Sequence, residues 1–380
     1  MRINIAHKRG LLAVGACATA LAVAGCGDSG SSSDSNGSGE GGSGNFPAAE
    51  AATAKFETRP TSIGIETPVG AKIPRGKDIA FVQCGVPACA TEAEILKTAT
   101  DLLGWNLHSI NAGSTPEEIK AAYQQAINEK PDAVLSSGFP RALYEPELKT
   151  LNKMNIPVVQ AFVGDSTGNG LTGVIGGPVA SEIEGKGMAN YILTHSSEEA
   201  PKVGQVYVNG FETTVNVAAA LKGQLEAECA ECSTEDLVVP VASIGSDLPQ
   251  RVSSFLTSNP DIEWSSIAYA DLMVGLPTAL KGAGIEDTNL VTLNLNPAIA
   301  PYMSKGEFLR LGFMVSYPES YWREIDLLAR YFTGRPYEEN LDDSTLPYWA
   351  VTEENLPSTT EEFPAVVDYE EQFKKLWGLG

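Results

Sequence analysis

A serine between two glycines is the strongest candidate for a nucleophile in this chain. The segment Gly164-Asp165-Ser166-Thr167-Gly168 has the G-x-S-x-G spacing and follows a predicted strand, as the nucleophile turn of an α/β hydrolase does. Such a turn must enter a helix, whereas residues 168–175 indicate a turn and another strand. The serine would also need an imidazole base, and beyond residue 25 the sequence contains only His108 and His195. A secreted α/β hydrolase is therefore an alternative, and we expect that the protein is not an enzyme.

The same region has the glycine spacing of a dinucleotide-binding turn, at Gly168, Gly170 and Gly173. This spacing holds a pyrophosphate only where a helix N-terminus follows, and none is predicted here. A second match at residues 37–42 lies in low-complexity sequence. The sequence contains no G-x-x-x-x-G-K-[ST] segment and no cluster with metal-ligand spacing. We therefore expect no catalytic residues, no cofactor, no metal site and no ATP hydrolysis by this chain.

Four cysteines form two local pairs, Cys84 with Cys89 and Cys229 with Cys232. In an oxidising compartment, close pairs favour disulfides, each worth roughly 2 kcal/mol on the chain-entropy model. Zinc bound by four thiolates is one alternative, and a redox C-x-x-C at 229–232 is another. The long gap between the pairs argues against zinc, and the sequence around 229–232 is not thioredoxin-like. We predict two disulfides.

The start of the chain predicts export. A basic segment precedes an uncharged run over residues 11–24, which is too short to span a bilayer core of roughly 30 Å. Val23-Ala24-Gly25-Cys26 resembles a bacterial lipobox, in which the cysteine receives lipid such as palmitate and becomes the mature N-terminus. Cys17 is the weaker candidate because a shorter apolar run precedes it. We expect residues 1–25 to be a signal peptide and the mature protein to be lipid-anchored on the extracytoplasmic face of the cell membrane.

A Gly/Ser-rich tract follows Cys26 and contains too few apolar residues to pack into a core. We expect residues 26–71 to form a disordered tether with an r.m.s. reach of about 40 Å. The formal net charge of the chain is −22, and removal of three basic leader residues makes it −25. A charge that negative repels phosphate backbones and excludes nucleic acid as a partner. The 43% of hydrophobic residues is ample for a packed core, which favours two domains.

From residue 77 onward, short β-rich runs alternate with amphipathic helical stretches. The predicted strands are 79–83, 105–110, 133–136, 157–162, 202–208, 237–241, 265–270, 290–295 and 308–315. The predicted helices are 91–103, 116–130, 143–154, 178–194, 213–228, 246–258, 274–283, 298–305 and 319–333. Thr115 with Glu118 has the spacing of a capping box, and Gly104 and Gly334 stand where helices end.

This alternation predicts an α/β fold of two doubly wound lobes, each with a parallel sheet and right-handed crossovers. In such sheets, ligands bind beyond the carboxyl ends of the strands. We therefore expect the loops at those ends to carry the function.

Two of those loops carry a resemblance to a known family. Ala268-Tyr269-Ala270-Asp271 ends a strand and precedes a helix, as the Ala-x-Asn-Asp segment of the type I periplasmic solute-binding proteins does. Asn294-Leu295-Asn296-Pro297 precedes Gly306 at the spacing of a family strand end, with Asn294 in place of a ligand-binding Asp. The order of elements over residues 77–352 also resembles that of the ribose/galactose-like branch of the family.

The resemblance implies two lobes that close over one solute, joined by three crossings near Gly176, Ser316 and Thr345. It implies a first lobe of residues 72–176 and 317–344 and a second lobe of 177–316 and 345–380. It also implies a monomeric solute-binding lipoprotein of an ABC transporter, whose partners are a permease and its ATPase. A receptor that feeds a membrane sensor kinase is the alternative within the same fold.

The sequence departs from the sugar-binding pattern of the family. The first loop is Cys84-Gly85-Val86-Pro87-Ala88-Cys89, and the third, at 137–141, lacks the usual Asp. Arg141 could clamp a carboxylate, whereas Glu212 and Asp271 could accept hydrogen bonds from hydroxyls or an amine. The solute class therefore stays open between a sugar and another polar, aromatic or carboxylated molecule. The predicted ligand-binding residues are Val86, Phe139, Arg141, Phe162, Phe211, Glu212, Tyr269, Asp271, Asn294 and Tyr317.

Overall fold

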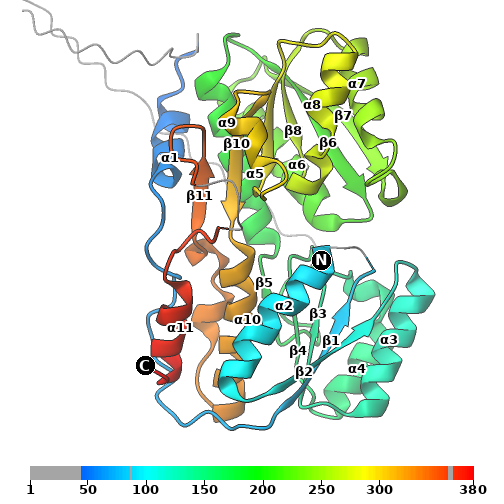
Figure 1. Cartoon of the computed structure of the whole chain (residues 1–380), viewed down its shortest axis with the longest axis vertical. Coiled ribbons are helices and arrows are strands. Elements are labelled where there is room, and N and C mark those ends of the chain that lie inside the picture. Colours follow the sequence, from blue (N-terminus) through cyan, green and yellow to red (C-terminus); the bar gives the residue numbers. More distant parts are fainter. Residues whose placement is uncertain (1–43, 86–87, 358–362) are drawn as a thin grey trace, which may run out of the picture. The chain divides into compact units, whose positions relative to one another are not determined.

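Two β-sheets organise the chain (Figure 1). The first has the order β2-β1-β3-β4-β5 and is parallel throughout. The second has the order β11-β10-β9-β8-β6-β7 and is parallel except where β11 pairs with β10. The strands are β1 (Asp78–Gln83), β2 (Asn106–Asn111), β3 (Ala133–Ser136), β4 (Val158–Ala161), β5 (Gly173–Ile175), β6 (Lys202–Asn209), β7 (Ser233–Pro240), β8 (Ile262–Ile267), β9 (Asn289–Leu293), β10 (Leu309–Val315) and β11 (Tyr348–Val351).

Helices connect the strands and pack on both sheets. The computed structural model describes residues 44–85, 88–357 and 363–380. The α-helices are α1 (Pro47–Glu57), α2 (Ala88–Leu103), α3 (Pro116–Glu129), α4 (Glu145–Lys153), α5 (Pro178–His195), α6 (Glu212–Glu228), α7 (Leu248–Ser258), α8 (Leu276–Gly282), α9 (Ala300–Ser304), α10 (Tyr317–Thr333) and α11 (Tyr369–Trp377). Short 3-10 turns are η1 (Arg141–Leu143), η2 (Val241–Ser243), η3 (Ala270–Met273), η4 (Glu338–Leu341) and η5 (Asp343–Thr345).

The contacts of the helices define two lobes. The first lobe is the first sheet with α2, α3, α4 and α10, and the second lobe is the second sheet with α5 to α9. The predicted α/β fold of two doubly wound lobes is confirmed. None of the described helices is long and apolar enough to cross a membrane.

Local sequence accounts for the start of α3 and the end of α10. Thr115 caps α3 with both halves of a capping box, because its hydroxyl accepts the Glu118 N–H while the Glu118 carboxylate accepts the Thr115 N–H. Gly334 ends α10 in the left-handed conformation that glycine adopts without strain. Among the predicted strands, the largest shift of a boundary is at β7, which starts at Ser233 and not at residue 237. This edge strand is largely exposed, so its first half carries no apolar run.

The chain passes between the lobes where the sequence predicted, after β5, after β10 and before β11. Asp343 joins the first of these crossings to the third. Its Oδ1 accepts the Gly176 N–H at 2.9 Å and its Oδ2 accepts the Gly177 N–H at 2.8 Å, and all three groups are buried. Asp343 therefore satisfies two backbone donors that the β5-to-α5 passage leaves without a partner in the sheet.

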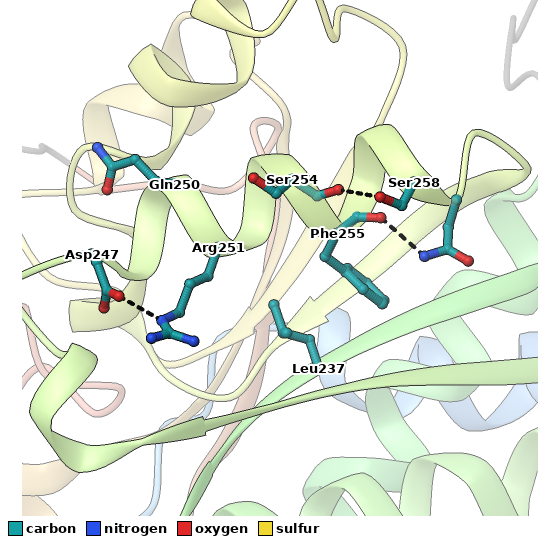
Figure 2. Close-up of a pocket in the computed structure, with 8 residues that line it drawn as sticks. Leu237, Asp247, Gln250, Arg251, Ser254, Phe255 and Ser258 are labelled. Atoms are coloured by element: carbon teal, nitrogen blue, oxygen red, sulfur yellow. Dashed lines mark hydrogen bonds and ion pairs between the residues drawn. The ribbon is translucent and has the colours of Figure 1, made fainter.

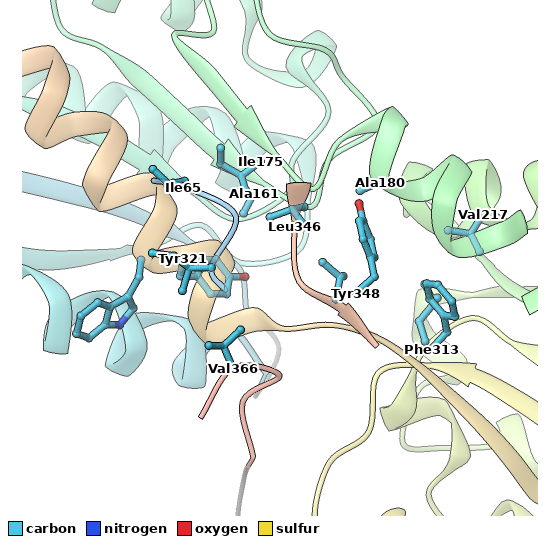
Figure 3. Close-up of a cluster of buried hydrophobic side chains, with 14 of the residues drawn as sticks. Ile65, Ala161, Ile175, Ala180, Val217, Phe313, Tyr321, Leu346, Tyr348 and Val366 are labelled. Atoms are coloured by element: carbon cyan, nitrogen blue, oxygen red, sulfur yellow. The ribbon is translucent and has the colours of Figure 1, made fainter. Parts of the chain in front are cut away.

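The expectation of a disordered tether over 26–71 is wrong for its described part. Residues 47–57 form α1, which packs on α5 and β11 of the second lobe. Ile63, Ile65 and Val69 then continue along the first lobe and are buried in the core (Figure 3). The Gly/Ser-rich composition stops before Phe46, and the residues beyond it supply enough apolar surface to pack. The tether is at most the part before residue 44, which lies outside the described residues.

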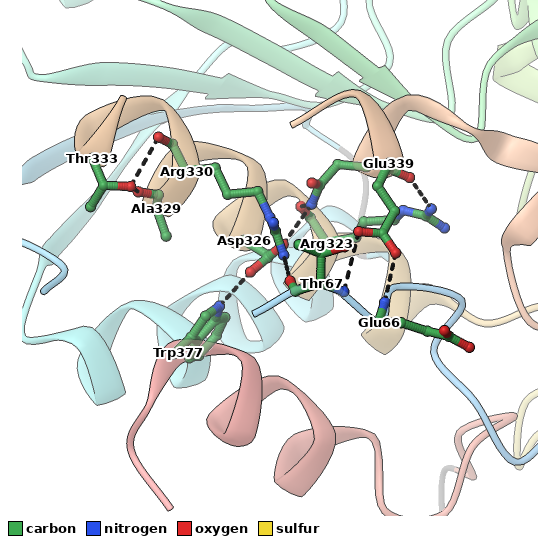
Figure 4. Close-up of polar contacts among 10 residues, drawn as sticks. Glu66, Thr67, Arg323, Asp326, Ala329, Arg330, Thr333, Glu339 and Trp377 are labelled. Carbon is green, nitrogen blue, oxygen red and sulfur yellow. Dashed lines mark hydrogen bonds and ion pairs between the residues drawn. The ribbon is translucent and has the colours of Figure 1, made fainter. Parts of the chain in front are cut away.

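The C-terminal helix corrects the expected boundaries of the second lobe. Residues 348–351 pair with β10 and so belong to the second lobe as expected, but α11 packs on α10 of the first lobe. The Trp377 ring stacks on Trp322 with ring centroids 5.4 Å apart. A polar network beside them joins three segments (Figure 4). The Asp326 carboxylate accepts hydrogen bonds from Trp377 Nε1 at 2.8 Å and from buried Arg330 at 2.7 Å, and Arg330 donates to the Thr67 carbonyl.

Both predicted disulfides are present. Cys84 is bonded to Cys89 and Cys229 to Cys232, with Cα–Cα distances of 5.7 and 5.3 Å. The first closes the turn between β1 and α2, and the second closes the turn between α6 and β7. The described residues contain no cluster of histidine, cysteine and acidic side chains that could hold a metal ion.

The packing of α1 predicts a specific loss of stability. The Phe56 ring lies edge-on to Phe313 with centroids 5.1 Å apart and also contacts Tyr348. We expect Phe56→Ala to lower the free energy of unfolding by about 2 kcal/mol, since it leaves a partly buried aromatic site empty. Lys55→Ala, at the exposed neighbouring position, is the control and should change stability by less than about 0.5 kcal/mol. Equal urea midpoints for the two variants would contradict the packing of α1.

Candidate ligand-binding site

Most of the predicted residues lie at the carboxyl ends of parallel strands. Phe162 follows β4, Tyr269 and Asp271 follow β8, Asn294 follows β9, and Tyr317 begins α10 after β10. We call these five residues, Phe162, Tyr269, Asp271, Asn294 and Tyr317, the strand-end cluster, because their contacts bring them into one group. Its centre is Tyr317, a residue that is 39% exposed.

Phe162 is held in a strained backbone conformation. Its φ is 53°, in the left-handed region that an aromatic residue rarely adopts. The Phe162 N–H donates to the Ile175 carbonyl at 2.8 Å, and a Cβ at Gly176 would lie 2.7 Å from the Phe162 ring. Glycine at 176 therefore makes room for a ring that packs edge-on against Tyr317, with centroids 4.8 Å apart.

Asn294 has a second left-handed backbone, with φ of 59°. Its N–H donates to the Phe313 carbonyl at 2.9 Å, and its side-chain oxygen accepts the Val315 N–H at 3.0 Å. Because the oxygen is used in this way, the side-chain amide is the donor that reaches the Tyr317 hydroxyl. Asn294 thus orients Tyr317 and binds the ends of β9 and β10 together.

Asp271 supplies a carboxylate beside these rings. Its Oδ1 accepts a hydrogen bond from Asn296 Nδ2 at 2.7 Å. Burial raises the pKa of the Asp271 carboxyl, and the Asn296 bond lowers it in part. Tyr269 lies next to Asp271, and its ring centroid is 6.4 Å from that of Phe211. Burial and the Asp271 charge raise the pKa of the Tyr269 phenol.

The structure adds two residues that the sequence did not indicate. Glu92, in α2, accepts hydrogen bonds from Ser137 Oγ at 2.8 Å and from Tyr321. Burial raises the pKa of the Glu92 carboxyl. Tyr321 lies one helical turn after Tyr317 and has its ring 5.7 Å from that of Phe162. The four-residue spacing of the two tyrosines was the available signal, whereas nothing in the sequence placed Glu92 next to α10.

Four predicted residues lie elsewhere or are not described. Phe139 is packed in the core of the first lobe, and Val86 lies outside the described residues. Arg141 is paired with Asp165, with 3.2 Å between Nη2 and Oδ1, and its backbone N–H also donates to Asp165. Glu212 lies so close to Gly164 that no side chain could replace that glycine without a shift.

The hydrogen bonds of the two histidines do not place an imidazole base beside Ser166 of the G-x-S-x-G segment. His108 bonds to Glu129 at 2.7 Å, and His195 bonds to the Tyr191 carbonyl and stacks on that ring. Both imidazoles thus have partners other than Ser166. Residues 166 and 167 form an exposed turn, and Gly168 bridges to Leu171, so no helix follows the serine.

Two open surface hollows lie away from the strand-end cluster. The larger, of about 490 Å³, is lined by α7 and the edge strand β7, and its polar side chains bond mainly to one another or to the local backbone (Figure 2). The smaller, of about 330 Å³, lies between residues 67–70 and 335–339. Neither lining includes a residue of the strand-end cluster.

Comparison with solved structures identifies the class of fold. An ABC sugar transporter subunit from Rhodobacter sphaeroides matches with a TM-score of 0.63 and 18% identity over 74% of this chain and 99% of its own. A 5-methylthioribose transporter solute-binding protein from Thermotoga lettingae matches at 0.63 and 14%, over 82% of this chain and 95% of its own. The fructose-binding periplasmic domain of a hybrid two-component system matches at 0.62 and 16%, over 73% and 91%. Neither a protein-family model nor a curated protein sequence matches.

The chain has the type I periplasmic binding protein fold. Its structural neighbours include sugar-binding proteins of ABC transporters, at identities that establish the fold alone.

A buried carboxyl near the crossings predicts a pH dependence of stability. Glu184, in α5, is buried, and burial together with the Asp343 charge raises its pKa to about 8 from 4.5. Its neutral form therefore favours the folded state at low pH, and this contribution is lost as the pH rises from about 4.5 to about 8. We expect Glu184→Gln to flatten the fall in the unfolding midpoint between pH 5 and pH 8.

Glu182→Gln, at an exposed position of the same helix, is the matched control and should keep the wild-type slope. Other buried carboxyls such as Glu319 titrate in the same direction, so only the difference between the two variants is diagnostic. Parallel curves for Glu184→Gln and wild type would show that Glu184 is not neutral in the folded protein.

Proposed function

We propose that this protein binds a small solute at the strand-end cluster and delivers it to an ABC permease. The observation that carries the proposal is the exposed Tyr317 ring, set among Phe162, Asn294 and Asp271 where strands of both lobes end. Aromatic faces with a few oriented polar groups are typical of sites for small polar molecules. Structural neighbours that are described as binding sugars support the same class of function.

The crossings support capture by closure of the lobes. Each crossing is short, and Asp343 couples two of them through a single carboxylate. A hinge of this kind changes a few backbone torsions while each lobe keeps its own packing. A permease that binds the closed, liganded shape more tightly would then favour docking of the loaded protein at the membrane. The ATPase of such a transporter would be a separate partner.

The proposed location is the extracytoplasmic face of the cell membrane, with Cys26 as the lipid-bearing residue. Cys26 lies outside the described residues, so the sequence alone supports this part of the proposal. The first described residues begin close to α1, which leaves residues 26–43 as the spacer between lipid and fold.

We predict that Cys26→Ser releases the protein from the membrane. The thiol that accepts the lipid is lost, so the chain should move from the membrane fraction to the soluble extracytoplasmic fraction. Cys17→Ser is the matched control and should stay with the membrane. Immunoblots of fractionated cells measure both, and membrane retention of Cys26→Ser would overturn the anchor.

The second candidate function is sensing. It is favoured by the match to the periplasmic domain of a hybrid two-component system, which has the same fold. An adjacent gene for a membrane histidine kinase would favour sensing, and adjacent genes for a permease and an ATPase would favour transport.

We predict that Tyr317→Ala weakens solute binding about tenfold to a hundredfold, because it removes the exposed aromatic face of the site. A thermal-shift screen of the full chain against sugars, polyols, aromatic acids and amines would first identify a ligand, which stabilises the folded state. Titration calorimetry with that ligand then measures the variants. Tyr331→Ala, also exposed in α10 but at its other end, is the control and should bind as wild type does. Equal affinities for the two variants would place the solute elsewhere.

A further inference from the structure

The two disulfides stand at opposite ends of their strands. Cys84–Cys89 joins the carboxyl end of β1 to the first turn of α2, in the first lobe. Cys229–Cys232 lies in the second lobe, just before the amino end of β7. Ligands of doubly wound folds bind beyond the carboxyl ends of the strands. The first disulfide is therefore at the functional edge of its sheet, and the second is not.

A closed ring of one covalent and two hydrogen-bonded links passes through the first disulfide. The Cys84 N–H donates to Ser137 Oγ at 3.2 Å, and Ser137 Oγ donates to Glu92 Oε2 at 2.8 Å. Glu92 lies one helical turn after Cys89 in α2, so the ring returns to the disulfide. Ser137 is 4% exposed, and its hydroxyl is used both as acceptor and as donor. The disulfide and this hydroxyl thus hold α2 to the ends of β1 and β3.

The strand end that carries Ser137 is packed against the backbone of Phe162. A Cβ at Gly138 would lie 2.3 Å from the Phe162 carbonyl oxygen, so the two backbones are in direct contact. The Ser137 carbonyl accepts a hydrogen bond at 3.2 Å from Nε2 of Gln160, which stands in β4 just before Phe162. A shift of Ser137 therefore displaces the backbone that orients the Phe162 ring.

Phe162 is the ring on which the aromatic face of the candidate site depends. Its centroid is 4.8 Å from that of Tyr317 and 5.7 Å from that of Tyr321. The helix that carries both tyrosines, α10, also packs on α2, so the disulfide-held helix supports the same rings by a second route. All of these groups belong to the first lobe, and their arrangement is complete without closure of the lobes.

We propose that the Cys84–Cys89 disulfide is a positioning element of the solute site and acts through Ser137 on Phe162. The inference rests on the solute-binding function proposed above. A covalent link that fixes a strand end before the solute arrives removes part of the cost of ordering the site. Without the link, hydrogen bonds alone hold Ser137 between α2 and β1. The oxidised chain therefore binds the solute more tightly, although the role of the sulfur atoms is positioning and not contact.

Two double variants separate positioning from general stability. Cys84→Ser/Cys89→Ser, the β1 variant, opens the disulfide at the site, and Cys229→Ser/Cys232→Ser, the control variant, opens the other one. They are matched because the sequence separations are 5 and 3 residues, so that both disulfides close short loops. Urea unfolding of the full chain measures the stability that each variant loses.

Hydrogen exchange of the free protein tests the positioning without a solute. The N–H groups of Ser137 and Phe162 both donate to carbonyls of neighbouring strands of the first sheet. We expect the β1 variant to raise exchange at both amides by about tenfold more than its loss of global stability explains. The control variant should show no such local increase.

Calorimetry then tests the effect on binding. D-ribose, D-glucose, D-mannitol, benzoate and putrescine represent the classes in the thermal-shift screen, and the probe that raises the unfolding midpoint most is used. We expect the β1 variant to bind this probe about tenfold more weakly than wild type, and the control variant to bind it within about threefold of wild type.

Ser137→Ala tests the route, because it removes the hydroxyl and keeps both disulfides. It should weaken binding of the same probe, whereas Ser253→Ala, at a buried serine of the second lobe, should not. When Ser137→Ala is combined with the β1 variant, the loss should be smaller than the product of the separate losses, since both changes break the same ring. This single variant also carries the test if the β1 variant does not fold.

The outcomes distinguish this inference from the proposed function. A local rise in exchange together with weaker binding, both absent from the control variant, supports the positioning role. Unchanged exchange, equal affinities of matched variants, or losses that multiply in the combined variant overturn it and keep the solute-binding function, because the probe still binds. Silence of the whole screen overturns the proposed function and, with it, this role of the disulfide.

Discussion

The passage of the chain between two sheets is the constraint on which the rest of the structure depends. Gly176 and Gly177 leave the first sheet with backbone N–H groups that are buried and need acceptors. Asp343 supplies both from a segment that is 166 residues away in the sequence. The buried guanidinium of Arg323 holds the segment around it, because it donates to the Asp342 carbonyl and to Thr345 Oγ1 on either side of Asp343. One carboxylate thus holds together two of the segments that connect the lobes.

The same passage shapes the candidate site. Gly176 leaves room for the Phe162 ring, and Phe162 in its left-handed conformation directs that ring onto Tyr317. Asn294 repeats the conformation in the other lobe and orients the Tyr317 hydroxyl. Strain of this kind persists only where surrounding contacts over-determine the backbone, and two of the strained residues here stand at strand ends beside one tyrosine.

The lobes are connected by more segments of chain than the three inner crossings, and a buried polar network accompanies these further connections. α1 packs with the second lobe and the segment after it with the first, while α11 returns from β11 to α10. Asp326 links α10, α11 and η4 through Arg330, Trp377 and Asn340. Five stretches of chain therefore connect the lobes, and the additional two are the ends of the described chain. Motion of the lobes has to be accommodated by these terminal stretches as well.

The alternation of apolar runs and capped helices was enough to predict two lobes with parallel sheets, because period, caps and loop length are local properties, whereas the three inner crossings were expected from the resemblance to a known family. The two disulfides were also local, since each pair is separated by a few residues. The packing of residues 44–71, the placement of α11 and the approach of Glu92 to Tyr321 depended on partners far away in the sequence, 51 residues apart for Trp377 and Asp326. Arg141 shows the same limit at the site: its type predicted an anion clamp, but only the fold placed Asp165 beside it.

Sequence by itself determined which residues stand at strand ends, because strand ends are set by neighbours in the chain. The tertiary structure decided which of those residues meet and with what charge, because burial and charge pairing are properties of surfaces that the chain brings together only when it folds.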